Sequence, residues 1–401
     1  MKKLVRNLNA AIFLVLVSVF AADHALASSP GELGPFGVGR TTIVFHDQAR
    51  NRDLNTNIWY PTQATTGALA GYRFQVPLIG VDVTVQSEIA RQGAPVANGL
   101  FPLILFSHGN FAISTQSFFL TEALASHGFI VVAPDHRGNT LLDIGQPTAY
   151  TDIFLAISDR PRDISFLITA MKAKNTNFAD PFFAKINPLG VGVTGHSAGG
   201  LTSLIMASGF SGQGLVDLGL VPPPNFAPVP PDPRVKAIVP ISAGFFFPSA
   251  LTAAEISSIR VSTLLVTGTA DEAIPLVGVR AAFDLISANR VMESDLLNAF
   301  HFSFTNVCDF NEAIAAAGQT VLSAVFGPST ELPCQGALPI EKAHRITNLY
   351  ATAFSRYALK TLLSDICFLT EKYAERNEPD VLFQRKPYAL DKGLAFVLCR
   401  P

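Results

Sequence analysis

The stretch GVTGHSAGG, residues 192–200, sets a single serine, Ser197, between glycines on both sides. An apolar run precedes this stretch, and the helix-like segment LTSLIMAS follows the serine. The pattern G-x-S-x-G between a strand and a helix is typical of a nucleophile elbow, a sharp turn whose flanking positions must be small. We therefore predict that Gly195 and Gly199 let strand and helix approach closely, and that Ser197 is a catalytic nucleophile.

Strand-like and helix-like segments alternate from about residue 100 onward. Near-continuous apolar runs suit strands that are buried on both faces of a parallel sheet. The alternation predicts an α/β fold with a mostly parallel, doubly wound sheet and helices on both faces. Two earlier segments, 41–47 and 54–61, are typical of antiparallel edge strands. The predicted parallel strands are 103–109, 129–136, 191–197, 235–242 and 262–269, and the predicted helices are 164–171, 276–288 and 341–365.

The first 27 residues have the features of a secretory signal peptide. Lys2, Lys3 and Arg6 precede an apolar run that is too short to span a bilayer comfortably. The sequence ALA at 25–27 then fits the small-x-small cleavage rule. We expect residues 1–27 to be removed and the protein to be exported to the periplasm or outside the cell, and the alternative is an uncleaved anchor.

The remaining residues, 28–401, are predicted to form one catalytic domain. A Pro-rich insertion near 220–233 suits neither a helix nor a central strand. The net charge is −2 and the chain contains 31 Phe, a composition that favours an apolar ligand. A nucleic-acid partner is not expected, because it would require a basic face, and we expect no stable membrane span.

Four cysteines lie in the last quarter of the chain. An even number of cysteines in an exported protein favours disulfides, and three connectivities are possible. Pairing neighbours closes the shortest loops, which predicts Cys308–Cys334 and Cys367–Cys399. Their spacing is not that of a metal site, so we expect no metal and no organic cofactor.

A serine nucleophile needs a base, usually His, and a carboxylate that orients the base. In an elbow of this kind the chain order is Ser, then the acid, then His. His301 and His344 are the histidines that follow the serine. His344 lies in a predicted long helix and is interpreted as a helix-surface residue. His301 follows the strand-like segment VMESDLLNAF, residues 291–300, in what is expected to be the loop after the last strand, and is therefore the expected base.

The predicted acid is Asp271, which ends the segment STLLVTGTAD at the carboxyl end of a strand. Its neighbour Glu272 is the rival. Asp284 and Asp295 are less suitable, because both fall within predicted elements.

The oxyanion of the tetrahedral intermediate requires two N–H donors. One is expected from Ala198, directly after the nucleophile, and the other from the loop after an earlier strand. The segment FSHGN ends such a strand, so Asn110 is the second expected donor. Four other histidines precede turns or loops and are interpreted as structural or pocket-wall residues: His108, His127, His136 and His196.

Several motifs are informative in combination: FSHGN, LASHGFIVVAPDHRGN, RPRDISFLI, GHSAGG, GTADEAIP and HFSFTNVCDF. Together they resemble the α/β-hydrolase branch that holds the platelet-activating-factor acetylhydrolases and their bacterial relatives, often labelled predicted dienelactone hydrolases. The resemblance covers roughly residues 100–310. It implies Ser197 as nucleophile, Asp271 as acid and His301 as base, with Asn110 and Ala198 as oxyanion donors. Dienelactone hydrolases use a Cys nucleophile, so that label fits poorly. Secreted polyester hydrolases and cutinase-like lipases are similar in layout.

The predicted function is therefore a serine esterase that acts through an acyl-enzyme on short-acyl, apolar or lipid-like esters. Alternatives are a lipase or cutinase-like polyester hydrolase, an amidase or peptidase, and a hydrolase-fold binding protein without catalysis. Phe111 and the run Phe245, Phe246 and Phe247 are candidate substrate-binding residues, and core packing is the alternative for the run. The sequence leaves the oligomeric state open.

Overall fold

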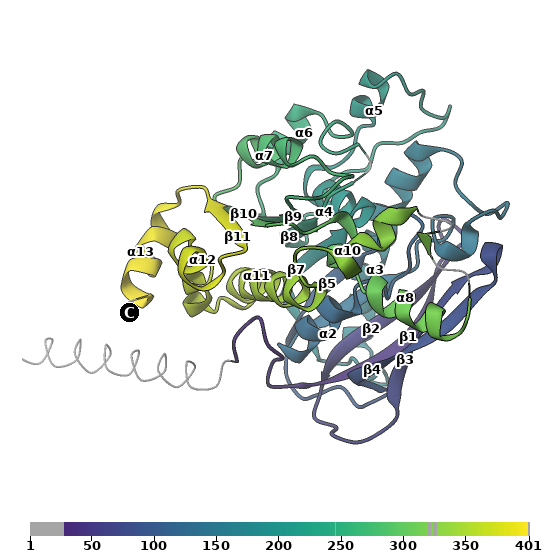
Figure 1. Ribbon diagram of the computed structural model, residues 1–401, viewed down its shortest axis with the longest axis horizontal. Helices are drawn as coiled ribbons and strands as arrows, with labels where there is room; N and C mark the ends of the chain where they lie inside the picture. Colours follow the sequence, from purple (N-terminus) through teal and green to yellow (C-terminus); the bar gives the residue numbers. More distant parts are fainter. Residues whose placement is uncertain (1–27, 245, 320–321, 324–326, 400–401) are drawn as a thin grey trace, which may run out of the picture.

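The computed structural model describes residues 28–244, 246–319, 322–323 and 327–399. In this part of the chain, eleven strands form one sheet in the order β11-β10-β9-β8-β7-β5-β6-β2-β1-β4-β3 (Figure 1). The predicted signal peptide, residues 1–27, and the candidate pocket residue Phe245 lie outside the described residues. The expectations for both stay predictions.

Six neighbouring strands of the sheet run parallel to one another. They are buried on both faces, as the near-continuous apolar runs predicted, because helices cover both sides of the sheet. The five predicted parallel strands are confirmed. The strands are β5 (Phe101–Ser107), β6 (Ile130–Pro134), β7 (Ile186–His196), β8 (Val235–Ile241), β9 (Ser262–Gly268) and β10 (Val291–Leu296).

Two apolar clusters, one on each face of the sheet, form the core. In β5, Ile104 and Phe106 belong to one cluster, whereas Leu103 and Leu105 belong to the other. The molecule is therefore a doubly wound α/β protein with helices on both faces of the sheet, as predicted. The first face is covered by α2 (Phe118–Ser126) and α11 (Ile340–Lys360), and the second by α3 (Ile153–Thr176), α4 (Ala198–Ser208), α6 (Ala253–Ser258) and α7 (Leu276–Leu285).

The first four strands extend the sheet beyond β6. The predicted pair β1 (Gly37–Asp47) and β2 (Arg52–Thr62) is antiparallel, as expected. It does not lie at the edge, because β2 pairs with β6 and β1 pairs with β4 (Val81–Gln92), while β3 (Leu69–Val76) is the edge strand. Neither β3 nor β4 was predicted, although the burial of β3 alternates with the period of two that is typical of a strand with one buried face.

Helix α3 begins earlier than predicted. Its N-cap is Asp152, whose carboxylate accepts a hydrogen bond from the Phe154 N–H at 2.7 Å, and the helix continues through Pro161. The periodicity rule locates the segment from 164 onward but gives no boundary where a proline interrupts the pattern. The earlier start places Arg160 and Asp163 on the helix, and both are fully buried.

The last quarter of the chain carries two disulfides, paired as predicted. Cys308 is bonded to Cys334 with a Cα–Cα distance of 5.6 Å, and Cys367 to Cys399 at 5.2 Å. An unpredicted strand, β11 (Val381–Arg385), pairs antiparallel with β10 at the sheet edge. The remaining elements are α5 (Gln213–Asp217), α8 (Val307–Ala316), α10 (Leu332–Gln335), α12 (Glu371–Asn377), α13 (Ala389–Leu398) and the 3-10 turns η1 (Pro77–Ile79), η2 (Leu141–Asp143), η3 (His301–Phe304), η4 (Pro328–Thr330) and η5 (Leu363–Cys367).

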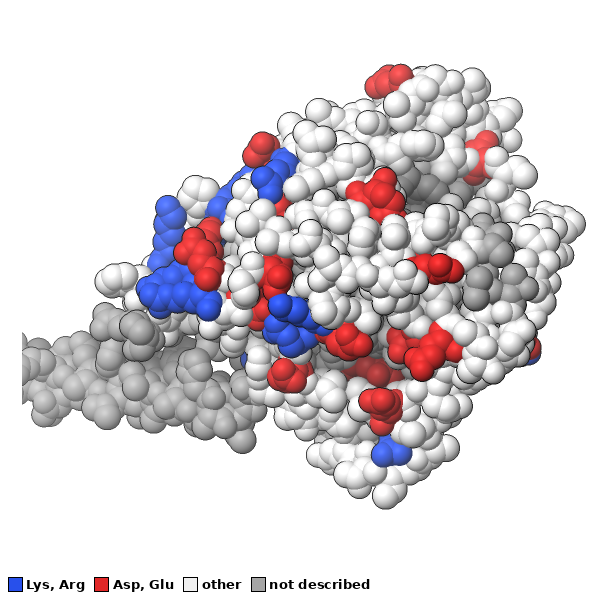
Figure 2. All heavy atoms as spheres, in the orientation of Figure 1, with Lys and Arg blue, Asp and Glu red and all other residues white. Residues whose placement is uncertain are grey.

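The predicted Pro-rich insertion, 220–233, lies outside helices and strands apart from a bridge between Phe210 and Val229. On the face drawn in Figure 2, Lys and Arg gather toward the C-terminal end of the molecule, and much of the remaining surface is uncharged. Within the described residues no helix combines the length and the apolar character that crossing a membrane requires.

Candidate active site

Ser197 occupies a strained turn between β7 and α4. Its backbone angles are φ 55° and ψ −120°, which residues other than glycine seldom adopt. The turn is held by two hydrogen bonds, from the Ser197 N–H to Ile241 O at 2.9 Å and from the Gly244 N–H to Ser197 O at 2.8 Å. Between Val191 and Gly200, Ser197 is the one residue that is not buried. The turn therefore presents this side chain to solvent at the carboxyl end of the sheet.

The flanking glycines make the turn possible. A Cβ on Gly199 would lie 1.7 Å from Ser107 O, and a Cβ on Gly195 would lie 2.4 Å from the same oxygen. No side chain fits at such distances, so strand β5, the elbow and α4 approach as closely as the motif predicted.

Gly244, which was not predicted, lies directly against Ser197. A Cβ at this position would be 2.7 Å from Ser197 Oγ and 3.3 Å from the Ala198 nitrogen. A glycine three residues after the end of the buried strand β8 gives no specific signal in the sequence. Its absent side chain leaves room where an acyl group would approach Ser197 Oγ.

His301 and Asp271 form a hydrogen-bonded pair. The imidazole Nδ1 lies 3.0 Å from Asp271 Oδ2 and 3.1 Å from Oδ1. Asp271 also accepts the backbone N–H groups of Ala273 and Ile274, at 2.9 and 2.8 Å. Burial alone raises the pKa of Asp271, but the hydrogen bonds that its carboxylate accepts, chiefly from His301, outweigh burial and lower the pKa below its ordinary value. The carboxylate therefore stays ionised and holds the imidazole with Nδ1–H directed at itself.

The rival acid and base have other contacts. Glu272 is exposed, and its carboxylate accepts the backbone N–H of His301 at 3.4 Å instead of contacting the ring. The ring of His344 stacks on Phe119 at a centroid distance of 3.7 Å, and its Nε2 donates to Thr305 O at 2.9 Å. His344 is thus a packed residue, not the helix-surface residue that was expected.

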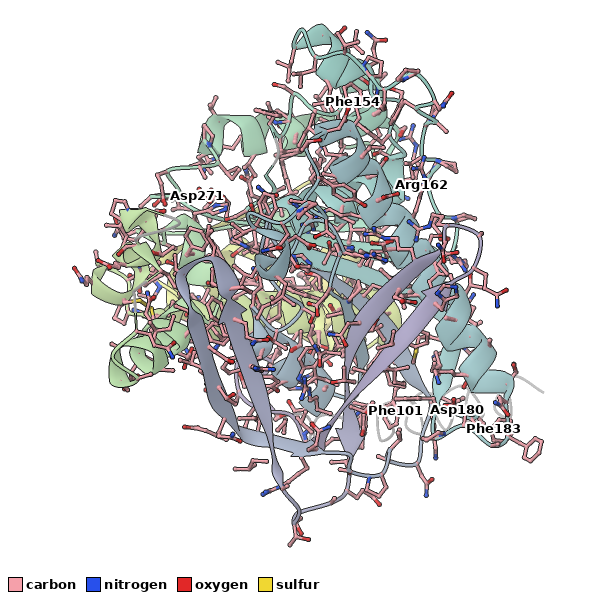
Figure 3. All side chains as sticks on the ribbon, turned by 90° about the vertical axis from the view of Figure 1, so that its right-hand side faces the viewer. Phe101, Phe154, Arg162, Asp180, Phe183 and Asp271 are labelled. Atoms are coloured by element: carbon pink, nitrogen blue, oxygen red, sulfur yellow. A yellow bond between two sulfur atoms is a disulfide. The ribbon has the colours of Figure 1, made fainter. Side chains whose placement is uncertain are left out.

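The two remaining acid candidates also have other surroundings. Asp295 lies on β10 and pairs with Arg280 at 2.6 Å, while Asp284 is exposed on α7. Figure 3 shows Asp271 well away from Phe101, Asp180 and Phe183, which lie together near the amino end of β5. This placement agrees with a site at the carboxyl ends of the parallel strands.

A buried hydrogen-bond relay joins the three loops of the candidate site. Gly109 N–H donates to Gln116 Oε1 at 2.6 Å, and Gln116 Nε2 donates to His196 Nδ1 at 2.9 Å. His196 Nε2 then donates to His301 O at 2.8 Å. Burial is the main cause that lowers the pKa of His196 to about 3, so the ring is neutral and can accept and donate in this way. Gln116 was not predicted, and His196 has the structural position that was expected.

The two expected oxyanion donors belong to loops that meet at the elbow. Ala198 is the first residue of α4, and Asn110 follows Gly109 at the end of β5. A Cβ on Gly109 would lie 3.5 Å from Ser197 Cβ, so the Asn110 loop touches the elbow. The Asn110 side chain is exposed, and its Oδ1 accepts a hydrogen bond from Asn139 Nδ2 at 2.7 Å.

An apolar cavity of about 80 Å³ adjoins this loop. Phe111 lines it, with a backbone φ of 48° that turns the chain after Asn110. Phe246 is 58% exposed, and Phe247 is packed in the core at 6% exposure, so neither lines this cavity. Most of the lining was not predictable from local motifs, and it comprises Phe74, Asn110, Phe111, Ala112, Ile113, Gln116, Leu141, Phe302, Thr305, Val307, Phe310, Leu322 and Thr330.

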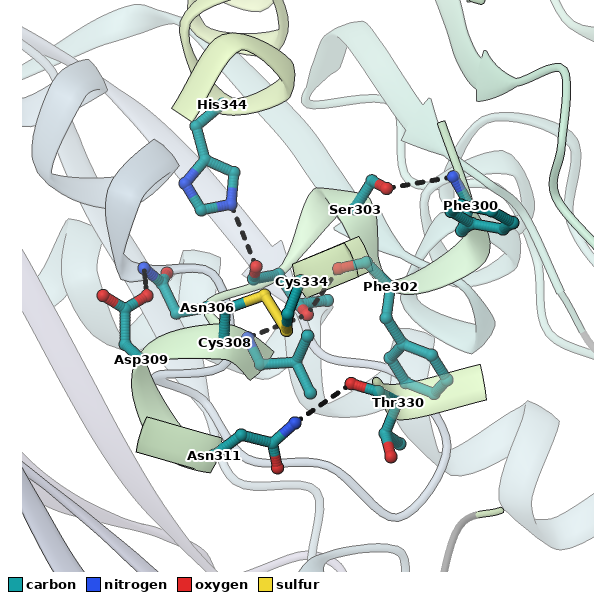
Figure 4. The surroundings of a disulfide bond; sticks show 12 residues. Phe300, Phe302, Ser303, Asn306, Cys308, Asp309, Asn311, Thr330, Cys334 and His344 are labelled. Carbon is teal, nitrogen blue, oxygen red and sulfur yellow. Dashed lines mark hydrogen bonds between the residues drawn. A yellow bond between two sulfur atoms is a disulfide. The ribbon is translucent and has the colours of Figure 1, made fainter. Parts of the chain in front are cut away.

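The Cys308–Cys334 disulfide holds one wall of the cavity. It joins α8 to α10, and Asn311 Nδ2 donates to Thr330 O at 3.1 Å beside it (Figure 4). Phe310 and Thr330 from these segments line the cavity. The disulfide therefore stabilises the segment that follows His301 and the wall that this segment builds.

A second Ser-His-Asp arrangement lies beneath the candidate site. Ser107 Oγ is 2.8 Å from His136 Nε2, and His136 Nδ1 is 2.9 Å from Asp163 Oδ2. All three side chains are fully buried. Burial, then the charge of Arg160, lowers the pKa of His136 to about 4, so this imidazole is neutral at pH 7. Asp163 also accepts Arg50 and Arg52, at 2.7 and 2.8 Å.

Two comparisons with known proteins bear on the site. A family model described as Chlorophyllase matches residues 74–221, which include Asn110 and Ser197 and end before Asp271. Platelet-activating factor acetylhydrolase from Cavia porcellus is 29% identical over 120 residues, which cover 26% of this chain and 28% of that protein. The match thus spans less than a third of the relative's length. The fold and both comparisons support the placement of this chain in the α/β-hydrolase branch that its motifs predict.

Proposed function

We propose that this protein is an exported serine esterase with Ser197 as nucleophile, His301 as base and Asp271 as the acid that orients the base. The observation that carries the proposal is the half-buried serine on a strained turn, beside a loop that holds a hydrogen-bonded His–Asp pair. A strained backbone conformation of this kind costs about 1–3 kcal/mol. A serine with a purely structural role does not require it, so the strained turn supports a functional role for Ser197.

The proposed reaction is acyl transfer in two steps. Ser197 Oγ attacks the ester carbonyl while His301 Nε2 accepts the hydroxyl proton, and the N–H groups of Asn110 and Ala198 stabilise the oxyanion. The C–O bond to the alcohol then breaks, and His301 returns the proton to the departing oxygen. Water repeats the sequence on the acyl-enzyme and releases the carboxylic acid.

A short or compact apolar acyl group is the proposed substrate class. The cavity beside Asn110 is apolar and far smaller than the several hundred Å³ of a pocket for a drug-sized ligand. The matched relative is named an acetylhydrolase, which supports the same class. The two disulfides support export, since such bonds persist in oxidising compartments.

The proposal is tested with purified protein lacking residues 1–27, and with its Ser197→Ala variant. A fluorophosphonate probe should label the wild type once, at Ser197, and p-nitrophenyl acetate and butyrate should be cleaved faster than p-nitrophenyl palmitate. The Ser197→Ala protein should neither react with the probe nor turn over these esters. Labelling at another residue, or retained turnover in the variant, would reject the assignment.

A further inference from the structure

We propose that Arg160 is a positioning residue that aims the Asn110 N–H at the oxyanion, with Asn139 as its partner. The inference rests on the proposed function, because it assigns a role in stabilising the same oxyanion. We call residues 108–112 the oxyanion loop. Arg160 is the first residue of the RPRDISFLI motif, and the sequence pattern assigns it no role.

Arg160 reaches the oxyanion loop from the buried side. It projects from α3 and is fully buried. Its Nη1 donates to His108 O at 2.6 Å, and its Nη2 donates to Gly109 O at 2.8 Å. The planar guanidinium thus spans two successive carbonyl groups with fixed spacing, which a flexible ammonium group does not reproduce.

Because the peptide bond is planar, holding the Gly109 carbonyl also fixes the direction of the Asn110 N–H. A trans peptide is planar, so its C=O and N–H point in opposite directions. Gly109 O is held by Arg160, and also by His108 Nδ1 at 2.7 Å. The N–H of the same peptide unit belongs to Asn110 and must therefore point away from the buried guanidinium. On the other side, Gln116 fixes the Gly109 N–H at 2.6 Å.

Asn139 links the guanidinium to the exposed end of the loop. Its Oδ1 accepts Arg160 Nε at 2.9 Å, and its Nδ2 donates to Asn110 Oδ1 at 2.7 Å. Asn139 is itself buried, with 2% exposure, so both contacts are made by a fixed side chain. The side chain and the backbone of Asn110 are consequently tied to one buried group.

The charge of Arg160 acts in the same direction as its geometry. Burial lowers the pKa of Arg160 to about 9, which leaves the guanidinium positive at neutral pH. A carbonyl group that accepts a hydrogen bond from a cation is polarised, and this polarisation makes the N–H of the same peptide unit a stronger hydrogen-bond donor. A donor prearranged in this way pays no reorganisation when negative charge develops on the substrate oxygen.

The test compares Arg160→Lys with Arg162→Lys. Arg162 lies two residues further along α3, is only partly buried, and donates to Ala227 O on the Pro-rich insertion, so it is a matched control. Active sites are counted with a fluorophosphonate, and kcat and KM for p-nitrophenyl acetate are measured per titrated site. Arg160→Lys should lower kcat about 10²-fold with KM within about threefold, as for loss of one oxyanion donor. Binding of phenylboronic acid, which forms a tetrahedral serine adduct, should weaken similarly, and Arg162→Lys should match the wild type.

A merely structural role gives a different result. It would lower the melting temperature and the number of titrated sites but leave kcat and boronate affinity per site unchanged, and that outcome overturns the inference. If Arg160→Lys does not fold, Asn139→Ala decides, with an expected tenfold lower kcat at unchanged KM; an unchanged kcat then rejects the proposal. A wild-type protein that neither reacts with the fluorophosphonate nor cleaves esters would instead refute the proposed function.

Discussion

The molecule contains two Ser-His-Asp sets with the same chemical groups and very different surroundings. In the buried set, Ser107, His136 and Asp163 are joined by hydrogen bonds of 2.8 and 2.9 Å. In the candidate site, His301 and Asp271 are paired at 3.0 Å beside the elbow that carries Ser197. The hydrogen-bond geometry of the buried set is at least as close to a catalytic triad as that of the candidate site.

The difference between the sets is access, not composition. Ser107 belongs to β5, where every residue is buried, so no substrate reaches its hydroxyl. Ser197 sits on a turn with positive φ, and Gly244 leaves space over its Oγ. A catalytic serine thus needs a backbone that carries it out of the sheet, and small neighbours that leave its surroundings open. The buried set instead supports the strand from which the oxyanion loop departs.

Exchanging the two serines for alanine should separate the sets most sharply. Ser197→Ala should lower kcat by about 10⁴-fold or more, because the covalent step is lost. Ser107→Ala should retain kcat within about tenfold while lowering the unfolding free energy by about 1–3 kcal/mol, since His136 Nε2 loses its partner. Steady-state kinetics and denaturant unfolding of both variants check the prediction. Equal losses of kcat in the two variants would mean that Ser107 is as important for the reaction as Ser197.

The two aspartates should divide in the same way. Asp271→Asn should lower kcat by about 10³–10⁴-fold, because the amide disturbs the tautomer and the charge stabilisation of His301. Asp163→Asn should instead destabilise the fold by about 3–5 kcal/mol, because Arg50 and Arg52 lose a buried counter-charge. Thermal unfolding and kcat per titrated site distinguish the two outcomes.

Glu272→Gln is the control for the first aspartate, since Glu272 contacts the backbone of His301 and not its ring. Glu272→Gln should change kcat by less than about threefold, which means that little transition-state stabilisation is lost. A larger loss for Glu272→Gln than for Asp271→Asn would move the acid to Glu272.

The open space over Ser197 is testable at Gly244. Gly244→Ala should lower kcat/KM by about 10²-fold, because the added methyl lies 2.7 Å from Ser197 Oγ and displaces the reacting groups. Gly393→Ala, on α13 with no atom within 4 Å of the added carbon, is the matched control. Activity assays on both variants at equal folded concentration give the comparison. Full activity in Gly244→Ala would show that the space is not needed.

The catalytic candidates were predictable because local motifs specify them. The G-x-S-x-G pattern, the carboxyl ends of strands and the order along the chain suffice to select Ser197, Asp271 and His301. The relay through Gln116 and the Arg160 contacts were not predictable, because they join residues whose spacing carries no local signal. Gln116 reaches His196 across 80 positions, and Arg160 reaches His108 across 52.

The same distinction applies to the fold. Buried parallel strands produce continuous apolar runs, so all five expected ones are present. The outer strand β3 alternates in burial and the terminal strand β11 is short, so the pairing of β3 with β4 and of β11 with the distant strand β10 decides their state. The cavity lining is missed for a related reason, because Phe74, Phe302 and Phe310 come from three separate segments.

Acid should weaken the buried set by protonating His136 before it protonates Asp163. The pKa of His136 is lowered to about 4, chiefly by burial, so the folded protein binds this proton less readily than the unfolded chain. Stability from this group is therefore complete above about pH 6.5 and is lost as the pH falls toward 4, by roughly 3 kcal/mol in total. Asp163 has a lowered pKa as well, so its contribution is lost only at still lower pH.

Urea unfolding between pH 7.5 and 4.5 measures this loss. In His136→Asn, the slope of the unfolding free energy against pH between 6 and 4.5 should be smaller than in the wild type. The largest expected decrease corresponds to one bound proton, about 1.4 kcal/mol per pH unit. A variant with the wild-type pH dependence would mean that other buried groups, such as His127 with its pKa lowered to about 4, account for the acid sensitivity.

The disulfides should show the smallest effect on chemistry, and they should differ from each other. Each closes a loop of about 30 residues and contributes about 3 kcal/mol in the chain-entropy model. Cys308–Cys334 also holds the cavity wall after His301, whereas Cys367–Cys399 fastens η5 to α13. The double variant Cys308→Ala/Cys334→Ala should therefore lose stability and raise KM for p-nitrophenyl butyrate about threefold to tenfold, on the scale of one weakened apolar contact. The double variant Cys367→Ala/Cys399→Ala should lose similar stability and keep the wild-type KM. If the two double variants have the same KM, the cavity wall held by Cys308–Cys334 does not contribute to substrate binding.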